Sequence, residues 1–148
     1  MNYKECKVNN SIEVLKIMEQ FDEVFPRKLS TIVPSMKKYA EKVFRNAEVY
    51  ACKLEEETIG YIVFYCNDLV NQSSYISQLA VKNSYRNCGI GKKLLEICKN
   101  ESIYNNMKYI RLEVDIINSD ALRFYSKNNF KIEREASKDS MYKIGRAH

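Results

Sequence analysis

Histidine is almost absent from this chain of 148 residues, because the only one is His148, the last residue. A residue at a chain end is usually mobile, which makes it a poor catalytic group. This scarcity excludes a conventional Ser-His or Cys-His mechanism and leaves no histidine cluster for a catalytic metal. Any acid or base must be Asp, Glu, Tyr, Lys or Cys, and we expect chemistry without a metal.

Long apolar runs and paired cysteines are also missing. No stretch approaches the roughly 20 apolar residues that cross a bilayer, and residues 1–10 are too polar for a secretory signal. We therefore expect a cytoplasmic protein with no membrane partner. No C-x-x-C pair of the kind found in zinc sites or redox motifs occurs. We expect reduced, mostly buried thiols at all five positions: Cys6, Cys52, Cys66, Cys88 and Cys98.

The length and the charge of the chain limit the number of domains and the class of partner. A chain of 148 residues with 45% hydrophobic residues can bury one sizeable core, so we expect a single domain over residues 1–148. The formal net charge is +5, but the lysines and arginines are spread along the chain and form no recognised nucleic-acid module. We expect no nucleic-acid partner.

The first third of the chain is predicted to form a strand and two helices. A strand over 3–8 precedes a capping signal at residues 10–13, which opens a helix that Pro26 ends. Its predicted apolar stripe is Ile12, Leu15, Met18, Phe21 and Phe25. After a loop, Pro34 is predicted to open a second helix with helically spaced apolar residues at Met36, Tyr39, Ala40, Val43, Phe44 and Ala47.

The remaining chain alternates strands and helices in the overall order βααβββαβαββ. Residues 48–54 and 58–67 predict an antiparallel hairpin with a turn at Glu55-Glu56-Glu57, and 75–81 predict another strand. A helix follows Gly89, with an apolar side made of Ile90, Leu94, Ile97 and Cys98. Residues 109–116 alternate, with Ile110, Leu112, Val114 and Ile116 on one face. A helix over 119–128 and strands near 130–135 and 140–144 complete the series.

The segment Arg86-Asn87-Cys88-Gly89-Ile90-Gly91-Lys92 joins a predicted strand to a predicted helix. Free N–H groups and the positive end of the helix dipole make such a place suitable for an anion. Its glycines let a phosphate approach the backbone closely. The segment lacks the spacing of a nucleotide P-loop, and G-x-G-x-x-G is absent, so neither a mononucleotide kinase nor a Rossmann protein is indicated.

Two linked motifs lie between residues 79 and 130. Leu79-Ala80-Val81 followed by residues 85–95, with an intact [QR]-x-x-G-x-[GA] core, resembles the acetyl-CoA motif of the GNAT family of acetyltransferases. Leu112-Glu113-Val114, Asn118, Ala121, Phe124-Tyr125 and Phe130 resemble its second cofactor segment. The resemblance implies the α/β (α+β) GNAT fold. This is a mixed, mostly antiparallel twisted sheet of about seven strands with about four helices, splayed between the fourth and fifth strands.

The sequence departs from the family pattern at two places. Asn83 stands where many members have proline, and Asn129 stands where glycine commonly precedes the phenylalanine. Asparagine tolerates the left-handed conformation that glycine supplies at a helix end, so we expect the turn before Phe130 to form.

The resemblance implies acetyl-CoA as co-substrate and assigns its contacts. The diphosphate would lie on the backbone amides of Arg86, Asn87, Cys88, Gly89, Ile90, Gly91 and Lys92. The pantetheine arm would run beside Leu79, Ala80 and Val81, with the Val81 amide polarising the thioester carbonyl. Contacts from the second motif would come from Asn118, Ala121 and Tyr125, and Asn118 is also a candidate helix cap.

Two side chains are candidates for proton transfer. An amine with a pKa of about 10.4 must lose a proton before or during attack. Glu113 resembles the glutamate that serves as base in some N-terminal acetyltransferases of the family; the alternative is a solvated strand residue or an ion pair, with Arg111 as a possible partner. Tyr125 matches the family's acid, which protonates the departing thiolate, and its alternative is a packed aromatic like Phe124.

The hypothesis is an acetyl-CoA-dependent N-acetyltransferase acting on a primary amine by direct attack in a ternary complex. The alternatives are a non-catalytic acyl-CoA-binding or sensing module, and acyl-enzyme chemistry at Cys88. The acceptor, a small molecule or a peptide, is not identified. Each side chain that is a candidate for the acceptor pocket is equally well explained as core or surface: Tyr75, Gln78, Phe25, Lys28, Thr31 and Tyr142. The assembly is expected to be a monomer or a homodimer.

Overall fold

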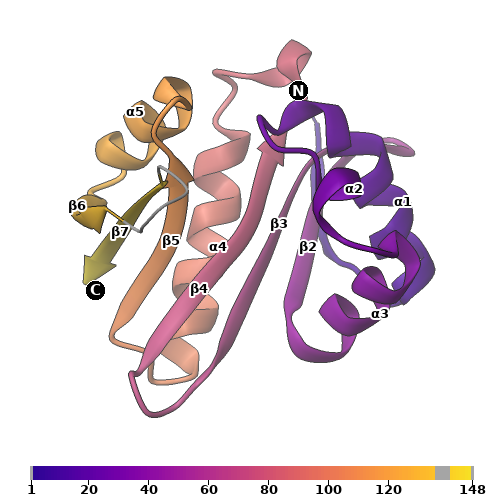
Figure 1. The fold of residues 1–148 in the computed structure, drawn as a ribbon. Helices are drawn as coiled ribbons and strands as arrows, with labels where there is room; N and C mark the ends of the chain where they lie inside the picture. The colour runs from indigo at the N-terminus through magenta and orange to yellow at the C-terminus, as the bar shows by residue number, and fades with distance from the viewer. Residues whose placement is uncertain (1, 136–140, 148) are drawn as a thin grey trace. The chain divides into compact units, whose positions relative to one another are not determined.

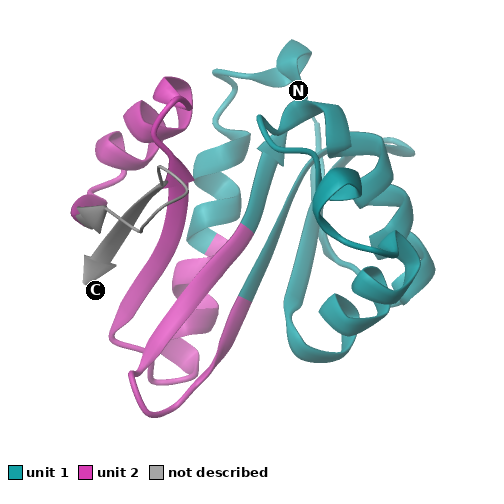
Figure 2. Ribbon diagram, viewed as in Figure 1, with its two compact units in different colours: residues 1–64, 78–96 teal, residues 65–77, 97–148 magenta. Residues whose placement is uncertain are grey.

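The computed structural model describes the backbone of residues 2–135 and 141–147 and the side chains of residues 2–133. The chain falls into two compact units, residues 1–64 with 78–96 and residues 65–77 with 97–148 (Figure 2). Three elements contribute to both units: β3 (Glu57–Asp68), β4 (Ser73–Val81) and α4 (Ile90–Tyr104). The single domain over residues 1–148 stays a prediction.

The first unit packs two helices with an antiparallel set of strands. Strand β1 (Lys4–Lys7) pairs with β2 (Glu48–Leu54), and β2 pairs with β3. Helices α1 (Ser11–Phe21) and α3 (Met36–Asn46) lie side by side (Figure 1). Apolar side chains from these helices and strands, from the residue after β1 and from the end of β4 form one buried cluster: Val8, Val14, Ile17, Met18, Phe21, Ala40, Val43, Val49, Ala51, Tyr61, Val63 and Ala80.

Helix α1 begins where the sequence predicts and ends about one turn earlier. The side chain of Asn10 accepts the N–H of Glu13 at 2.8 Å, which confirms the predicted cap. The α-helix ends at Phe21, and a 3-10 turn, η1 (Asp22–Val24), follows it directly. The prediction that Pro26 ends the helix is therefore wrong.

The buried faces of both helices differ in part from the predicted stripes. In α1 the buried residues are Val14, Ile17, Met18 and Phe21, whereas Ile12 is 67% exposed. In α3 the buried residues are Ala40 and Val43, and Phe44 is 38% exposed. Of the other residues in the predicted stripes, Leu15, Phe25, Met36, Tyr39 and Ala47 are partly buried and pack against the core.

A short helix, α2 (Leu29–Ile32), occupies the predicted loop and raises the number of described α-helices to five. The next helix, α3, begins after Pro34 because Ser35 is its cap: the Ser35 hydroxyl accepts the N–H of Lys38 at 3.2 Å. A serine side chain satisfies a free amide at a helix start, which proline cannot do, so the helix starts later than predicted.

The predicted hairpin of β2 and β3 is present and has a tight turn. Leu54 and Glu57 are partners in the ladder, so Glu55 and Glu56 make the connection. Glu55 has φ of 57°, a left-handed conformation. The ladder contains one irregularity between Cys52 and Lys53.

The second unit combines parallel and antiparallel pairing. The first residues of β4, Ser73–Ile76, pair in parallel with Tyr109–Leu112 of β5 (Tyr109–Asp115). On its other side β5 pairs antiparallel with β7 (Met141–Ala147), which pairs with β6 (Lys131–Glu135). Helix α5 (Ser119–Lys127) connects β5 to β6.

The strand order is β1-β2-β3-β4-β5-β7-β6. Seven strands in a mixed, mostly antiparallel sheet confirm the predicted fold class, with one helix more than expected. The parallel ladder of β4 and β5 covers the first four residues of β4, which continues to Val81. Pairing limited to one end of the two strands agrees with the predicted splay.

Strand β5 shows most of the predicted alternation. Ile110, Leu112 and Val114 are buried. Ile116 lies beyond the end of the strand and is 40% exposed, so its predicted place on the buried face is wrong. Asp115 is buried, at 8% exposure, although it belongs to the predicted polar face.

The structure bears on two absences noted in the sequence, membrane spans and paired cysteines. Among the described residues no helix has the length and apolar character of a membrane span. None of the five cysteines, all within the described residues, forms a disulfide: Cys52 and Cys98 are buried, Cys6 and Cys66 are half-buried, and Cys88 is exposed. The prediction of buried thiols is confirmed for Cys52 and Cys98, holds in part for Cys6 and Cys66, and is wrong for Cys88.

Candidate functional site

The loop between β4 and α4 presents backbone amides at a helix start. After the 3-10 turn η2 (Asn83–Tyr85), Asn87 and Gly89 have φ of 63° and 81°. The first hydrogen bond of α4 runs from the Lys93 N–H to the Gly89 carbonyl at 3.1 Å. The amides of residues 90–92 therefore precede the helical ladder and suit an anionic ligand.

Gly60 brings the start of α4 close to the strands of the first unit. A Cβ built on Gly60 would lie 3.0 Å from Cγ2 of Ile90 and 3.1 Å from the carbonyl oxygen of Ala80. The absent side chain thus allows the first turn of α4 to pack beside the end of β4. Sequence reasoning missed this residue, although a glycine inside a strand is itself a signal of close approach.

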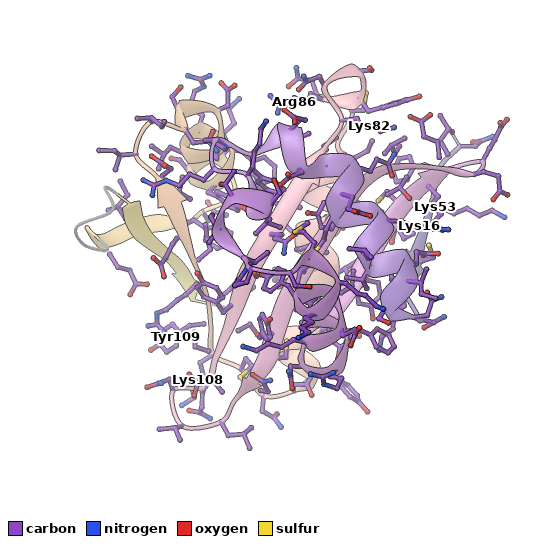
Figure 3. The ribbon with its side chains drawn as sticks, turned by 45° about the vertical axis from the view of Figure 1, so that its right-hand side comes forward. Lys16, Lys53, Lys82, Arg86, Lys108 and Tyr109 are labelled. Carbon is purple, nitrogen blue, oxygen red and sulfur yellow. The ribbon has the colours of Figure 1, made fainter. Side chains whose placement is uncertain are left out.

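The side chains of the loop are polar and exposed. Arg86, Asn87, Cys88 and Lys92 all lie at the surface, and Figure 3 shows Lys82 and Arg86 at this loop. Two neighbouring lysines are held by glutamates: Lys82 by Glu57 at 2.6 Å and Lys93 by Glu5 at 3.9 Å. The Cys88 thiol lies 3.6 Å from the Arg86 carbonyl oxygen, where it makes a local contact.

The strand segment before the loop alternates in exposure. Ala80 is 5% exposed, whereas Leu79 and Val81 are half-buried. The next amide, that of Lys82, donates to the Ile59 carbonyl at 2.9 Å, which ties the end of β4 to β3. The predicted cofactor residues from Leu79 to Lys92 all belong to the first unit.

Tyr125 projects from α5 into an aromatic group of the second unit. Its ring meets Phe124 and Phe130 edge-on, with ring centroids 5.2 and 5.3 Å away, and the residue is 7% exposed. Burial first, and the Cys98 thiol second, raises the pKa of Tyr125 above its ordinary value. The hydroxyl therefore stays protonated at neutral pH, as an acid requires. The packed-aromatic alternative is thus confirmed, and the role of Tyr125 as an acid stays a prediction.

The helix that carries Tyr125 is closed at its C-terminal end. The Phe130 N–H donates to the Tyr125 carbonyl at 3.0 Å, and the Asn128 side chain donates to the Phe124 carbonyl at 2.8 Å. Asn129 has φ of 70°, which confirms the left-handed conformation expected where relatives have glycine.

The N-terminal end of α5 is capped by Asn118. Its Oδ1 accepts the Ala121 N–H at 3.2 Å, and its own N–H donates to the Asp115 carbonyl at 2.9 Å. The carboxylate of Asp115 also accepts the Ile117 N–H at 3.2 Å. The capping reading of Asn118 is thus confirmed, while its contact with pantetheine stays a prediction.

Cys98 joins a buried polar cluster of the second unit. The hydroxyls of Ser74 and Ser102 lie 2.7 Å apart, and Cys66 lies 3.1 Å from Ser74. Cys98 contacts Ser102 at 3.9 Å. Burial raises the pKa of the Cys98 thiol to about 12, so this thiol is not a reactive nucleophile at neutral pH.

Glu113 lies half-buried on β5 and accepts a hydrogen bond from a neighbouring strand. The Tyr75 hydroxyl donates to Oε1 of Glu113 at 3.3 Å. Arg111, the partner considered for Glu113, instead bonds to Glu133 at 3.0 Å and stacks on Tyr109. The carboxylate of Glu113 thus has a tyrosine beside it.

Among the acceptor-pocket candidates, Gln78 belongs to the core of the first unit. It accepts the Tyr61 hydroxyl at 2.5 Å and contacts Met18 and Tyr39 at 3.6 and 3.5 Å. Phe25 is half-buried and packs against the same core. The side chain of Tyr142 lies outside the described residues.

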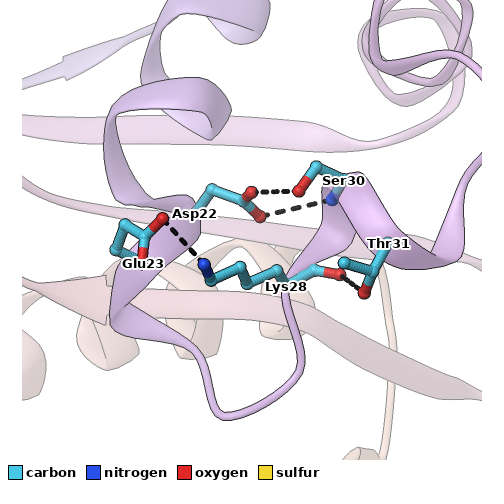
Figure 4. A network of polar contacts seen from close by, with 5 residues as sticks. All are labelled: Asp22, Glu23, Lys28, Ser30 and Thr31. Atoms are coloured by element: carbon cyan, nitrogen blue, oxygen red, sulfur yellow. Dashed lines mark hydrogen bonds and ion pairs between the residues drawn. The ribbon is translucent and has the colours of Figure 1, made fainter.

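Lys28 and Thr31 belong to a surface network around α2 (Figure 4). Lys28 pairs with Glu23 at 2.9 Å, and Thr31 donates to the Lys28 carbonyl at 2.7 Å. The carboxylate of Asp22 accepts both the hydroxyl and the N–H of Ser30, at 2.5 and 3.3 Å. Lys28 and Thr31 thus have local partners, and the network fixes the short helix.

The described residues contain no group of three or more His, Cys, Asp or Glu side chains placed to hold a metal ion. The second unit brings Glu113 together with Tyr75, and it also contains Asn118, Ala121 and Tyr125. What the arrangement offers is an anion-binding helix start in one unit, and a carboxylate and a protonated phenol in the other.

In sequence, residues 45–132 match the family described as "Acetyltransferase (GNAT) domain". Over 61 residues the chain is 39% identical to N-alpha-acetyltransferase 30 of Saccharomyces cerevisiae, a stretch that covers 41% of this chain and 35% of that protein. The matched stretch thus spans about a third of the length of this curated relative.

Solved structures share the fold over the whole chain. The PaiA N-acetyltransferase of Thermoplasma acidophilum, in complex with coenzyme A, superposes with a TM-score of 0.79 at 18% identity, and each chain is covered completely. Ard1 of Thermoplasma volcanium gives a TM-score of 0.80 at 18% identity, with 99% of this chain and 98% of that one covered. With a family match over more than half of its length, the chain belongs to the GNAT acetyltransferase family.

Proposed function

We propose that the protein is an acetyl-CoA-dependent N-acetyltransferase that transfers an acetyl group to a primary amine by direct attack in a ternary complex. The observation that carries this proposal is the helix start after Gly89, with left-handed residues at Asn87 and Gly89 and amides ahead of the helical ladder. Such a start binds a diphosphate. The fold relative from Thermoplasma acidophilum is a complex with coenzyme A, which supports the same ligand here.

The cofactor residues proposed for this chain are those of the two motifs. The amides of residues 86–92 would hold the diphosphate, and residues 79–81 would accompany the pantetheine arm, with Asn118, Ala121 and Tyr125 as further contacts. Bound acetyl-CoA supplies an activated acetyl group as a thioester, and the proposal includes no metal. The exposed loop suits this role because none of its bulky side chains covers the glycine at its turn.

The two titratable residues have separate tasks in the proposal. Glu113 takes a proton from the acceptor amine, directly or through a water, and Tyr75 orients the carboxylate by its hydrogen bond. The Val81 N–H donates to the carbonyl oxygen of the acetyl group, where negative charge develops. The Tyr125 hydroxyl, which burial keeps protonated, donates its proton to the departing sulfur.

The test is release of free thiol from acetyl-CoA with a panel of peptides, polyamines, amino sugars and amino acids. We expect release with one acceptor class, and a loss of kcat of about 10²–10⁴ in Tyr125→Phe, the usual contribution of a general acid. Tyr104→Phe is the matched control, because Tyr104 is 83% exposed in the same unit. Full activity of Tyr125→Phe would refute the role of this residue.

Glu113→Gln tests the base. We expect a lower kcat and a changed pH-rate profile with little change in acetyl-CoA affinity, while the exposed Glu96→Gln control behaves like the wild type. Heat protection by acetyl-CoA without thiol release for any acceptor would favour the non-catalytic acyl-CoA-binding module. A Cys88→Ala variant with full activity would exclude acyl-enzyme chemistry. Cytoplasmic location and a monomer or homodimer stay predictions.

A further inference from the structure

The side chain of Arg111 is held in place beside the candidate base Glu113. Both residues lie on the same face of β5, since they are two positions apart in a strand. The guanidinium carbon of Arg111 lies 4.5 Å from the centre of the Tyr109 ring, and Nε donates to Oε1 of Glu133 at 3.0 Å. One aromatic face and one carboxylate therefore fix the guanidinium.

The contact between Arg111 and Glu133 depends on strand geometry. Strand β7 lies between β5 and β6, and the residue of β7 opposite Arg111 is Gly145. Glycine has no side chain to separate the two partners. The register of β6 shifts between Ile132 and Arg134, which leaves Glu133 as the extra residue of a bulge. Bulges redirect a side chain, and this one directs Glu133 to Arg111.

The bond to Glu133 uses only part of the guanidinium. This bond is made through Nε, and the charge of Arg111 also acts on the Asp68 carboxylate. A guanidinium has four further N–H donors on its two terminal nitrogens. The side chain is 35% exposed, so a ligand can reach it. A planar pair of donors fits both oxygens of a carboxylate.

We propose that Arg111 binds a carboxylate of the acceptor while the acceptor amine lies at Glu113. This inference rests on the proposed function, because it takes Glu113 as the base. The Cα atoms of residues two apart on one strand face are about 7 Å apart. Stacking on Tyr109, the neighbour on the side away from Glu113, draws the guanidinium farther from Glu113 than this spacing. The acceptor class is therefore a primary amine that carries a carboxylate several bonds away, such as a peptide with Asp or Glu at its second position.

The same geometry disfavours other acceptors. A polyamine that placed one nitrogen at Glu113 would bring its next ammonium toward the Arg111 guanidinium, and like charges repel. The hydroxyls of an amino sugar would make neutral hydrogen bonds there, which are weaker than bonds to a carboxylate. Stacking on Tyr109 and the bond to Glu133 already restrict the guanidinium, so less rotamer entropy is lost on binding.

The experiment compares three peptides that differ only at the second residue, which is Glu, Gln or Lys. We measure kcat/KM for acetyl transfer and, separately, binding of each peptide to the protein saturated with coenzyme A. For the wild type we expect at least about a tenfold preference for Glu over Gln in both measurements, a ratio that one charge-assisted bond supplies. The Lys peptide is expected to be the poorest of the three.

Variants assign the preference to Arg111. Arg111→Met should bring the Glu-to-Gln ratio close to one, and Arg111→Lys, which keeps the charge without the planar pair of donors, should leave an intermediate ratio. Glu133→Gln should weaken the preference by releasing the guanidinium. Lys108→Met is the matched control, because Lys108 is an exposed cation close to Tyr109 (Figure 3). The Glu-to-Gln ratio of this variant should equal that of the wild type.

The two readouts separate this inference from the proposed function. Acetyl transfer with equal rates for the three peptides, or a ratio unchanged in Arg111→Met, overturns the role of Arg111 and leaves the acetyltransferase intact. Absence of transfer to these peptides and to the whole acceptor panel, together with an Arg111-dependent preference in binding, overturns the proposed function and supports the carboxylate site. Equal binding of the three peptides overturns the carboxylate site, and absence of transfer to the whole panel as well overturns both. An unchanged melting temperature of Arg111→Met shows that it is folded.

Discussion

Replacement of Gly60 by alanine tests how the start of α4 is positioned. In a strand, alanine is ordinarily better than glycine by a fraction of a kcal/mol, because glycine loses more backbone entropy on folding. At Gly60 the new Cβ would meet Ile90 Cγ2 at 3.0 Å and the Ala80 carbonyl oxygen at 3.1 Å. Ordinary contacts between carbon atoms begin at about 3.5 Å, so Cγ2 of Ile90 must move away by about 0.5 Å. The Ala80 oxygen belongs to the backbone and cannot rotate away as a side chain could.

The magnitude follows from this overpacking. An added methyl group in a close-packed site costs about 1–3 kcal/mol, which exceeds the gain in backbone entropy and sets the sign. At about 2–4 °C per kcal/mol for a chain near this size, the melting temperature should fall by several degrees. Because Ile90 is the first residue of α4, its displacement should also weaken acetyl-CoA binding, by about tenfold if one charge-assisted bond to the loop is lost.

The assay is urea unfolding for the free energy of unfolding, together with calorimetric titration of acetyl-CoA. Ile90→Leu removes Cγ2 and serves as the second arm of a double-mutant cycle. If the clash is the cause, Gly60→Ala should cost less in the Ile90→Leu background than alone. A Gly60→Ala protein with wild-type stability and acetyl-CoA affinity would refute the reasoning.

Two further predictions concern local conformation and thiol chemistry. Because Asn129 has φ of 70°, Asn129→Gly should keep or raise the free energy of unfolding, and Asn129→Ala should lower it by about 1 kcal/mol, as measured by urea unfolding; equal values for the two variants would contradict this. Burial raises the pKa of both Cys52 and Cys98 to about 12, so iodoacetamide at pH 8 should label the exposed Cys88 first and spare these two until the chain unfolds; mass spectrometry of digests would reveal the opposite order.

The half of the chain that carries the motifs was predicted well from the sequence. The helix starts after Gly89 as expected, and Asn129 adopts the left-handed conformation that its place before Phe130 requires. These features depend on backbone preferences of a few neighbouring residues, which local sequence encodes directly.

Element ends in the first third were predicted less well, because distant contacts decide them. The Asp22 carboxylate accepts hydrogen bonds from Ser30, eight residues later, and these bonds stabilise a short helix that the apolar pattern does not predict. Ser35 starts α3 because it satisfies an amide that Pro34 cannot reach. Which residue caps a helix depends on contacts in the folded chain, and the spacing of apolar residues does not predict it.

Partners of single side chains were the least predictable. Arg111 was considered as a partner of Glu113, two residues away on the same strand face. The structure pairs it with Glu133, 22 residues later, because of a bulge in β6 and a glycine in β7. Neither the bulge nor the strand order can be read from residues 109–116 alone.

Both ends of α5 are closed by hydrogen bonds, at Asn118 and at Phe130. An isolated helix of nine residues would be marginal in water and would lose structure from its last turns inward. With hydrogen bonds at both of its ends, α5 should lose structure from its first and last turns less readily than an uncapped helix of the same length. The turn that carries Tyr125 should therefore exchange its amide hydrogens more slowly than nine residues alone would lead one to expect.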